Sequence, residues 1–225
     1  MSRATRMSLI GVLAAGAILC SLWFGPRAHA EKVKAVGEHV DWLPVVQLAG
    51  SRVDIAANKG WKIVYFWSDS CPCVKRCEQV NFIPLSRRFQ GQVSFYGIAS
   101  NASNVRYRKI QEHGNEVELP LLRVPGSAGF WPPYPLLVDA RHQVADLLGA
   151  TFTPEVFLLS PDNELLYRGV PDDSKEYEER TGKRGLTQNY LQEALEEALA
   201  GKKVTRPTMP ARAFCAIDRT DVASK

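Results

Sequence analysis

The chain alternates between short apolar runs and longer amphipathic stretches, and each kind has the length of one element of secondary structure. Short runs that are apolar, or that alternate apolar with polar residues, are typical of strands. Such runs lie at residues 43–48, 62–67, 93–99, 136–138, 155–160 and 164–168. The last two flank the turn sequence Pro161-Asp162-Asn163, and this arrangement predicts a hairpin.

Between the strands, apolar positions recur at helical spacing. We expect helices at residues 72–90, 104–113, 143–148 and 187–200. Pro84 predicts a kink or a break in the first helix, and Gly114 predicts the end of the second. Strands and helices in this order predict an α/β domain whose mixed central sheet is covered by helices on both faces.

Two kinds of segment do not follow either pattern. Residues 115–134 contain several prolines and glycines, together with Phe130, Trp131 and Tyr134, which predicts an inserted loop without regular structure. That loop either forms a wall beside a functional site or packs its aromatic side chains locally at the surface. Charged runs such as Asp172-Asp173 are interpreted as solvated surface.

The first 30 residues have the pattern of a secretory signal peptide. Basic residues precede an apolar run, and Ala28-His29-Ala30 is a cleavage sequence of the Ala-x-Ala type. We therefore expect export to the periplasm, whereas an uncleaved apolar run would bring the chain into contact with a membrane. The expected parts are a signal peptide (1–30), a polar lead-in (31–42), one domain (43–201) and a tail (202–225).

Charge and cysteine content narrow the class of protein. The chain has a formal net charge of +4, but its predicted signal peptide holds three arginines and no acidic residue, so the remainder is close to neutral. This balance leaves no basic patch typical of nucleic-acid binding. Beyond the signal peptide the cysteines are Cys71, Cys73, Cys77 and Cys215. Two structural disulfides are one interpretation, although cysteines so close in sequence make poor long-loop crosslinks.

Cys71-Pro72-Cys73 carries the most specific chemistry in the chain. It stands where the apolar strand at residues 62–67 gives way to a predicted helix, so Cys71 lies at the helix N-terminus. Free backbone N–H groups, the positive end of the helix dipole and nearby basic residues favour a thiolate there. The sequence therefore predicts a reactive sulfur at Cys71.

Residues 66–72 resemble the passage from strand to active site in thioredoxin-like proteins. The later Thr153-Pro154 resembles the segment of that fold in which a proline lies across from the redox cysteine. Residues 145–159 are similar to bacterial redoxins of the alkyl hydroperoxide reductase/thiol-specific antioxidant type, and the similarity covers residues 43–217 and includes Cys215. The resemblance implies a thioredoxin-like fold with a cis proline at Pro154, opposite the redox cysteine. It also implies that Thr153 and Pro154 shape the substrate groove.

Two departures from that family bear on the chemistry. Thioredoxin-like reductants carry Cys-x-x-Cys, whereas Val74 stands in the place of the second cysteine and Cys73 comes one residue earlier. The acidic residue that many thioredoxins bury on the preceding strand is matched here by Tyr65. The handling of protons at the site must therefore differ from that of the family.

The main functional hypothesis is an exported thiol–disulfide oxidoreductase. Cys71 would attack a substrate disulfide, and a second thiol would resolve the mixed disulfide. The candidates for that thiol are Cys73, Cys77 and Cys215, and we favour Cys73, although a Cys71–Cys73 ring is small and strained. The hypothesis implies no organic cofactor and no metal. Its partners are protein or small thiol and disulfide substrates, and a redox partner protein that supplies electrons.

Two other functions would use the same cysteines. In a peroxiredoxin-like peroxidase, Ser68 would supply the hydroxyl before Cys71, but Val64 stands where the motif of that family has proline. In a Cu(I)-binding metallochaperone, the ligands would be the thiols of Cys71, Cys73 and Cys77. The Cys73–Cys77 spacing is that of Sco-type copper-delivery proteins, which also need a later histidine, and residues 147–225 contain none.

Overall fold

The computed structural model describes residues 33–42, 46–48, 51–112, 114–123, 132–211 and 214–220. The predicted signal peptide and residues 124–131 of the predicted loop lie outside the described residues. Within the described ranges, no helix has the length and apolar character needed to cross a membrane.

Strands and helices follow one another much as the apolar pattern predicts. The strands are β1 (Val46–Leu48), β2 (Ser51–Val53), β3 (Trp61–Trp67), β4 (Val93–Ala99), β5 (Val105–Glu112), β6 (Asn115–Leu122), β7 (Leu136–Val138), β8 (Phe152–Thr153), β9 (Val156–Leu159), β10 (Leu165–Gly169), β11 (Thr208–Met209) and β12 (Cys215–Ala216). The helices are α1 (Pro72–Cys77), η1 (Glu78–Phe82), α2 (Ile83–Arg88), η2 (Ala102–Asn104), α3 (Gln143–Leu148), α4 (Ser174–Thr181) and α5 (Tyr190–Leu199).

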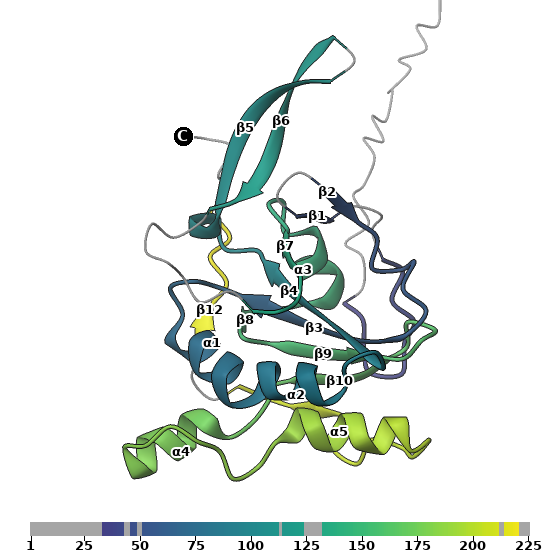
Figure 1. Ribbon diagram of the computed structural model, residues 1–225, viewed down its shortest axis with the longest axis vertical. Helices are drawn as coiled ribbons and strands as arrows, with labels where there is room; N and C mark the ends of the chain where they lie inside the picture. Colours follow the sequence, from purple (N-terminus) through teal and green to yellow (C-terminus); the bar gives the residue numbers. More distant parts are fainter. Residues whose placement is uncertain are drawn as a thin grey trace, which may run out of the picture. The chain divides into compact units, whose positions relative to one another are not determined.

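Among the described strands, eight form one mixed sheet in the order β11-β10-β9-β3-β4-β7-β1-β2 (Figure 1). β3 and β4 run parallel at its centre, and β9 pairs antiparallel with the other side of β3. β9 and β10 form the predicted hairpin, and β11 pairs in parallel with β10 at the edge. The C-terminal tail therefore contributes a strand to the sheet.

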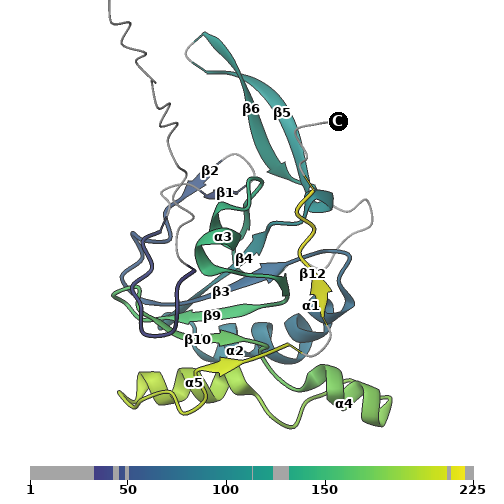
Figure 2. The ribbon, with the colours of Figure 1, turned by 180° about the vertical axis from the view of Figure 1, so that it is seen from behind.

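The side chains of β3 alternate between two apolar clusters. Ile63, Tyr65 and Trp67 belong to the cluster that includes α1, α2 and α5. Val64 and Phe66 belong to the cluster that includes α3. Figures 1 and 2 show α2 and α5 on one side of the sheet and α3 on the other. The predicted mixed sheet with helices on both faces is confirmed.

The helix predicted at residues 72–90 is present, but it does not break at Pro84. The chain runs from α1 through the π-helical turn η1 into α2, and Pro84 stands in the first turn of α2. Proline has no backbone N–H to donate to the preceding turn, so it is tolerated at the start of a helical segment. The wider spacing of the π-helical turn leaves room for its ring. The helix that follows the predicted reactive cysteine is therefore continuous to Arg88.

The helix predicted at residues 104–113 is wrong. Residues 105–112 form β5, which pairs along its whole length with β6, a part of the stretch predicted to be irregular. Gly114, predicted to end a helix, lies in the hairpin turn with a φ of +81°. Tyr107 and Ile110 have a spacing that suits a helix, but strand pairing decides the outcome. The hairpin extends away from the main sheet (Figure 1).

Candidate active site

Cys71 lies between the end of β3 and the start of α1, where the sequence predicts a reactive sulfur. It is the N-cap residue of α1, and Pro72 begins the helix. The side chain is only 2% exposed. The backbone N–H of Val74, in the first turn, donates a hydrogen bond to the sulfur. Strand β3 therefore delivers Cys71 to backbone donors, as expected from the sequence.

Thr153 lies directly beside Cys71. The carbonyl oxygen of Thr153 is 3.4 Å from the Cys71 sulfur, and the following peptide bond, to Pro154, is cis. Thr153 is buried at the end of the short strand β8. The two residues expected to shape a substrate groove are thus adjacent to the predicted nucleophile.

Cys215 approaches Cys71 from the C-terminal tail. Strand β12 pairs antiparallel with β8, and this register sets Cys215 opposite Thr153. The Cys215 sulfur lies 2.8 Å from the Cys71 sulfur, although the two residues are 144 positions apart in sequence. Both cysteines are free thiols. The tail therefore brings a second sulfur into direct contact with Cys71.

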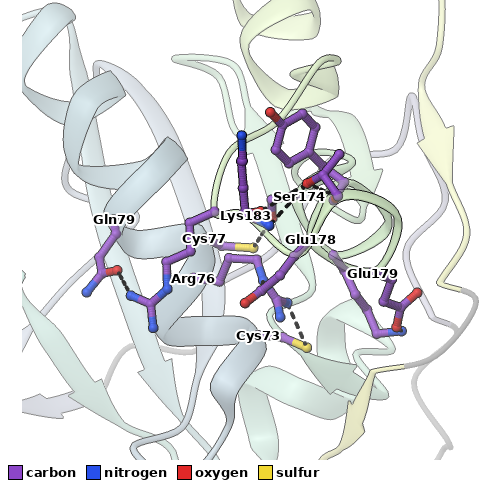
Figure 3. Close-up of polar contacts among 12 residues, drawn as sticks. Cys73, Arg76, Cys77, Gln79, Ser174, Glu178, Glu179 and Lys183 are labelled. Atoms are coloured by element: carbon purple, nitrogen blue, oxygen red, sulfur yellow. Dashed lines mark hydrogen bonds and ion pairs between the residues drawn. The ribbon is translucent and has the colours of Figure 1, made fainter.

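Cys73 supplies a third sulfur. The sulfur atoms of Cys71, Cys73 and Cys215 lie within 4.8 Å of one another. The Arg76 guanidinium is 3.6 Å from the Cys73 sulfur and forms an ion pair with Glu178 of α4 (Figure 3). We call Cys71, Cys73 and Cys215 the sulfur cluster.

Hydrogen bonds within the sulfur cluster select which thiol ionises. The Cys73 thiol lowers the pKa of Cys71 to about 5, with further help from Cys215, Thr153 and Val74, although burial acts in the opposite direction. The pKa of Cys73 is raised because its thiol donates to Cys71. Burial and the contact with Cys71 raise the pKa of Cys215 to about 11. Cys71 is therefore the thiolate at neutral pH.

Cys77 lies outside the sulfur cluster. Its sulfur is 3.7 Å from the Ser174 hydroxyl and 4.0 Å from an Asp172 carboxylate oxygen. The contact with Ser174 is drawn in Figure 3. Burial, followed by the Asp172 charge, raises the pKa of Cys77 well above its usual value. Although Cys77 is a candidate from the sequence, the structure places it in a different environment.

Asp172 is not solvated surface, contrary to the prediction. It is 2% exposed and accepts hydrogen bonds from the Asn81 side chain at 2.6 Å and the Ser174 backbone N–H at 2.8 Å. These partners satisfy the carboxylate in the interior. A sequence with two adjacent aspartates gives no sign that one of them turns inward.

Glu78 is a buried acid that the sequence reasoning missed. The Tyr65 hydroxyl donates to its carboxylate at 2.7 Å, and Trp67 also donates to it. Burial raises the pKa of Glu78 to about 7. Tyr65 thus stands where many thioredoxins have a buried acid, but the Glu78 carboxyl contacts Tyr65 from the facing helix. The burial of Glu78 could have been inferred from the sequence, because it lies one helical turn from the apolar residues Val74 and Phe82.

The sulfur spacing bears on the metal hypothesis. Among the described residues, the three thiols that could hold a soft ion are those of the sulfur cluster, not the predicted set that includes Cys77. Two thiolates bound to one ion at about 2.3 Å each stand roughly 4 Å apart. The 2.8 Å separation of Cys71 and Cys215 is closer to an S–S bond of about 2.05 Å. The pair suits a disulfide better than a shared metal.

Comparison with known proteins adds to this geometry at the level of the fold. No protein-family model matches the chain, and no curated protein sequence is similar to it. A hypothetical protein from Sinorhizobium meliloti 1021 matches with a TM-score of 0.60 and 23% identity, over 83% of this chain and 96% of that one. An uncharacterized conserved protein from Geobacillus kaustophilus matches with a TM-score of 0.58 and 21% identity, over 82% and 92%.

A looser match is a secreted Mycobacterium tuberculosis disulfide oxidoreductase. Its TM-score is 0.37 and its identity 14%, over 54% of this chain and 80% of that one. The fold of the present chain is thioredoxin-like, with a mixed central sheet flanked by helices. Its function follows from the site rather than from these likenesses.

Proposed function

We propose that this protein is a thiol–disulfide oxidoreductase in which Cys71 and Cys215 form the reversible disulfide. The observation that carries the proposal is the 2.8 Å separation of their sulfurs. Forming the bond requires the sulfurs to approach by only roughly 0.8 Å. Cys215 thus takes the place of Cys73, which we favoured from the sequence. The strained ring that a Cys71–Cys73 disulfide would close is then not needed.

The reaction has two steps. The Cys71 thiolate attacks a substrate disulfide, forms a mixed disulfide and expels one substrate thiolate. Cys215 then loses its proton and attacks the Cys71 sulfur, which forms the Cys71–Cys215 disulfide and expels the second substrate thiolate. Two electrons pass from the protein dithiol to the substrate, and a dithiol partner protein returns them. The same steps in reverse would oxidise a substrate dithiol.

Cys73 has a supporting role in this scheme. Its thiol donates to the Cys71 sulfur and is the largest cause of the low pKa of Cys71. A low pKa also makes Cys71 the better leaving group when the disulfide is reduced again. Cys73 therefore stabilises Cys71 in the thiolate form without itself becoming part of the disulfide.

We extend the proposal to export, with the periplasm as the compartment. In an oxidising compartment the Cys71–Cys215 disulfide can form and persist, and partner proteins would reduce it again. The support is the signal-peptide pattern of residues 1–30. Expression of the full chain in a bacterium should give a periplasmic protein whose N-terminus is Glu31, as measured by fractionation and mass spectrometry. A full-length protein in the membrane fraction would contradict this assignment.

The decisive experiment is a map of the cysteines in the oxidised protein. The purified protein is equilibrated with mixtures of reduced and oxidised dithiothreitol, free thiols are alkylated, and peptides are identified by mass spectrometry. We expect one disulfide, Cys71–Cys215, that forms and breaks reversibly, while Cys77 stays free. Cys77→Ser is the matched control, because it removes a buried thiol from the same helix. A Cys71–Cys73 bond, or thiols that do not cycle, would refute the proposal.

Peroxide reduction receives less support from the site. The Ser68 hydroxyl, which the peroxidase hypothesis needs beside Cys71, is 3.0 Å from the Ser70 hydroxyl, and Ser68 is buried. Hydrogen peroxide added to the reduced protein is therefore expected to oxidise Cys71 slowly compared with a reactive disulfide. Consumption of peroxide at a rate that exceeds disulfide exchange would favour the peroxidase instead.

A further inference from the structure

The C-terminal strap, defined as residues 214–219, lies along the site in an extended conformation. Cys215 and Ala216 pair with the two residues of β8, and the Ile217 N–H donates to the Thr151 carbonyl at 3.0 Å. The free edge of the segment around Thr153 is thus filled by the backbone of the strap. Figure 2 shows β12 close to the N-terminal end of α1.

Two side chains anchor the strap on either side of Cys215. The ring of Phe214 packs on Phe152, with centroids 5.4 Å apart. Ile217, two residues after the cysteine, is only 7% exposed and belongs to the apolar cluster that includes α3. The strap therefore occupies an apolar site as well as a strand edge.

Polar contacts fix the far end of the strap. The Asp218 N–H donates to the Asn101 side chain at 2.9 Å, and the Asp218 carbonyl accepts from the Ala102 N–H at 3.2 Å. Arg219 forms an exposed ion pair with Asp146 of α3. Contacts of this strength at a surface are reversible, so another extended segment can compete for the same place.

The strap blocks the approach of a large disulfide to Cys71. A thiolate attacks a disulfide sulfur at close range, and the Cys215 sulfur already lies 2.8 Å from Cys71. A sulfur on another protein must occupy that same position before it can react. A peptide disulfide therefore reaches Cys71 only by displacing the strap, whereas a small disulfide needs much less space.

We propose that the groove under the strap is a binding site for extended cysteine-containing peptides, and that the space filled by Ile217 selects an aliphatic side chain two residues after the reacting cysteine. The strap is then a built-in ligand that shows how such a peptide lies: backbone along β8, cysteine opposite Thr153, aliphatic residue in the α3 cluster. This inference rests on the proposed function and adds the substrate class to it.

The test uses the full chain with Cys215→Ser, so that the mixed disulfide at Cys71 accumulates. The probe is the hexapeptide Ala-Phe-Cys-Ala-Ile-Asp, which has the sequence of residues 213–218, with its cysteine linked to 2-thiopyridine. The Cys71 thiolate attacks the cysteine sulfur of the peptide, a Cys71–peptide disulfide forms, and pyridine-2-thione leaves with the electron pair. Its absorbance reports the rate. A second peptide carries aspartate in place of isoleucine, and 2,2′-dithiodipyridine is the small-disulfide probe.

The strap is loosened by adding Ile217→Ala to the Cys215→Ser protein. We expect the reaction with the isoleucine peptide to become at least tenfold faster, and that with 2,2′-dithiodipyridine to change less than threefold. In this variant the isoleucine peptide should react about tenfold faster than the aspartate peptide. Val40→Ala is the matched control, because Val40 is also buried in the α3 cluster but does not belong to the strap. It should leave all three rates unchanged.

A second loosening variant guards against a folding defect in Ile217→Ala. Arg219→Ala removes an exposed anchor, and we expect a smaller gain for the isoleucine peptide, about threefold. Equal rates for the two peptides, or no gain in either variant while 2,2′-dithiodipyridine reacts normally, would overturn the groove and leave the proposed function intact. If 2,2′-dithiodipyridine does not react at Cys71 in any variant, the proposed function is refuted, and the groove with it.

Discussion

Cys71 and Cys77 lie at opposite ends of α1, and their thiols have opposite properties. Both side chains are 2% exposed, although Cys77 is enclosed more deeply. Cys71 receives hydrogen bonds from two thiols and a backbone N–H, and its pKa falls to about 5. Cys77 faces the Asp172 carboxylate, and its pKa rises well above the usual value.

The difference shows that low exposure alone does not decide the direction in which the pKa of a cysteine shifts. Burial raises the pKa of both thiols, but only at Cys71 do donors outweigh it. The N-terminal end of α1 offers the Val74 N–H to the Cys71 sulfur and faces the tail. At its other end, Cys77 contacts Ser174 at the start of α4 and Asp172 in the segment before it. About 1.7 helical turns thus separate the proposed reactive thiol from a thiol that is packed in the interior.

Of the predicted differences between Cys71 and Cys77, the largest is the effect of substituting each of them on the rate of disulfide exchange. Cys71→Ser should lower the rate with a reactive disulfide by at least about 10³-fold, because the Cys71 thiolate is the nucleophile of the proposed reaction. Cys77→Ser should leave the rate within about threefold of the original. The measurement is the release of thiolate from 2,2′-dithiodipyridine under single-turnover conditions. Similar losses in the two variants would show that both ends of α1 take part in the reaction.

The second effect concerns the pH dependence of alkylation. With a pKa of about 5, Cys71 should react with iodoacetamide at a rate that rises between about pH 4 and 6 and is level above pH 6. At pH 7 it should react at least about 100-fold faster than Cys77, whose thiol stays protonated. Peptide mapping after timed alkylation measures both rates.

Cys73→Ala provides the control for that profile. Because the Cys73 thiol is the largest cause of the low pKa of Cys71, its removal should move the rise in alkylation to higher pH. A profile that stays in place would mean that the helix N-terminus and Cys215 suffice to stabilise the thiolate.

A smaller effect is expected at Glu78, on the buried side of the comparison. Its pKa of about 7 lies above the value in the unfolded chain, so its stabilising contribution is complete below about pH 4.5 and is lost as the pH rises through 7. Relative to Glu78→Gln, the original protein should lose about 2 to 3 kcal/mol of unfolding free energy between pH 4.5 and 8. Urea unfolding of both proteins at these pH values measures the difference, and a constant difference would contradict the prediction.

The smallest effect concerns Arg76, which lies on α1 between Cys71 and Cys77. It lies near the Cys73 sulfur and pairs with Glu178. Arg76→Met should lower the unfolding free energy by about 0.5 to 1 kcal/mol, as for a partly exposed ion pair. The exchange rate at Cys71 should stay within about threefold. Lys75→Met, which removes a neighbouring exposed charge, is the control, and equal stability losses would mean that the Glu178 contact contributes nothing specific.

Much of the fold could be predicted because its signal is local. β3 and β4 are apolar apart from Lys62 and Ser94, and α3 and α5 have helical spacing with an end signal at Gly149 or Gly201. The failure at residues 105–112 has the opposite cause. There the local pattern permits a helix, and the pairing with β6 decides for a strand.

The candidate site divides in the same way. The position of Cys71 at the start of a helix was predictable, because a strand followed by Cys-Pro is visible in consecutive residues. The place of Glu78 against Tyr65 and the inward turn of Asp172 were not, since each depends on a contact between segments that only folding brings together. Sequence spacing favours Cys73 as the partner of Cys71 for the same reason: it is near in the chain.

By itself, therefore, the sequence determined most of the order of the elements and the position of the proposed nucleophile, because both depend on hydrophobic periodicity and on the chemistry of neighbouring residues. The tertiary structure alone decided which of the other thiols meets it. Pairing of β12 with β8 brings Cys215 across 144 positions to 2.8 Å from Cys71, while the packing of α1 turns Cys77 toward Asp172 and Ser174. Long-range strand pairing and burial leave no local trace in the chain, and they fix the partners of each sulfur.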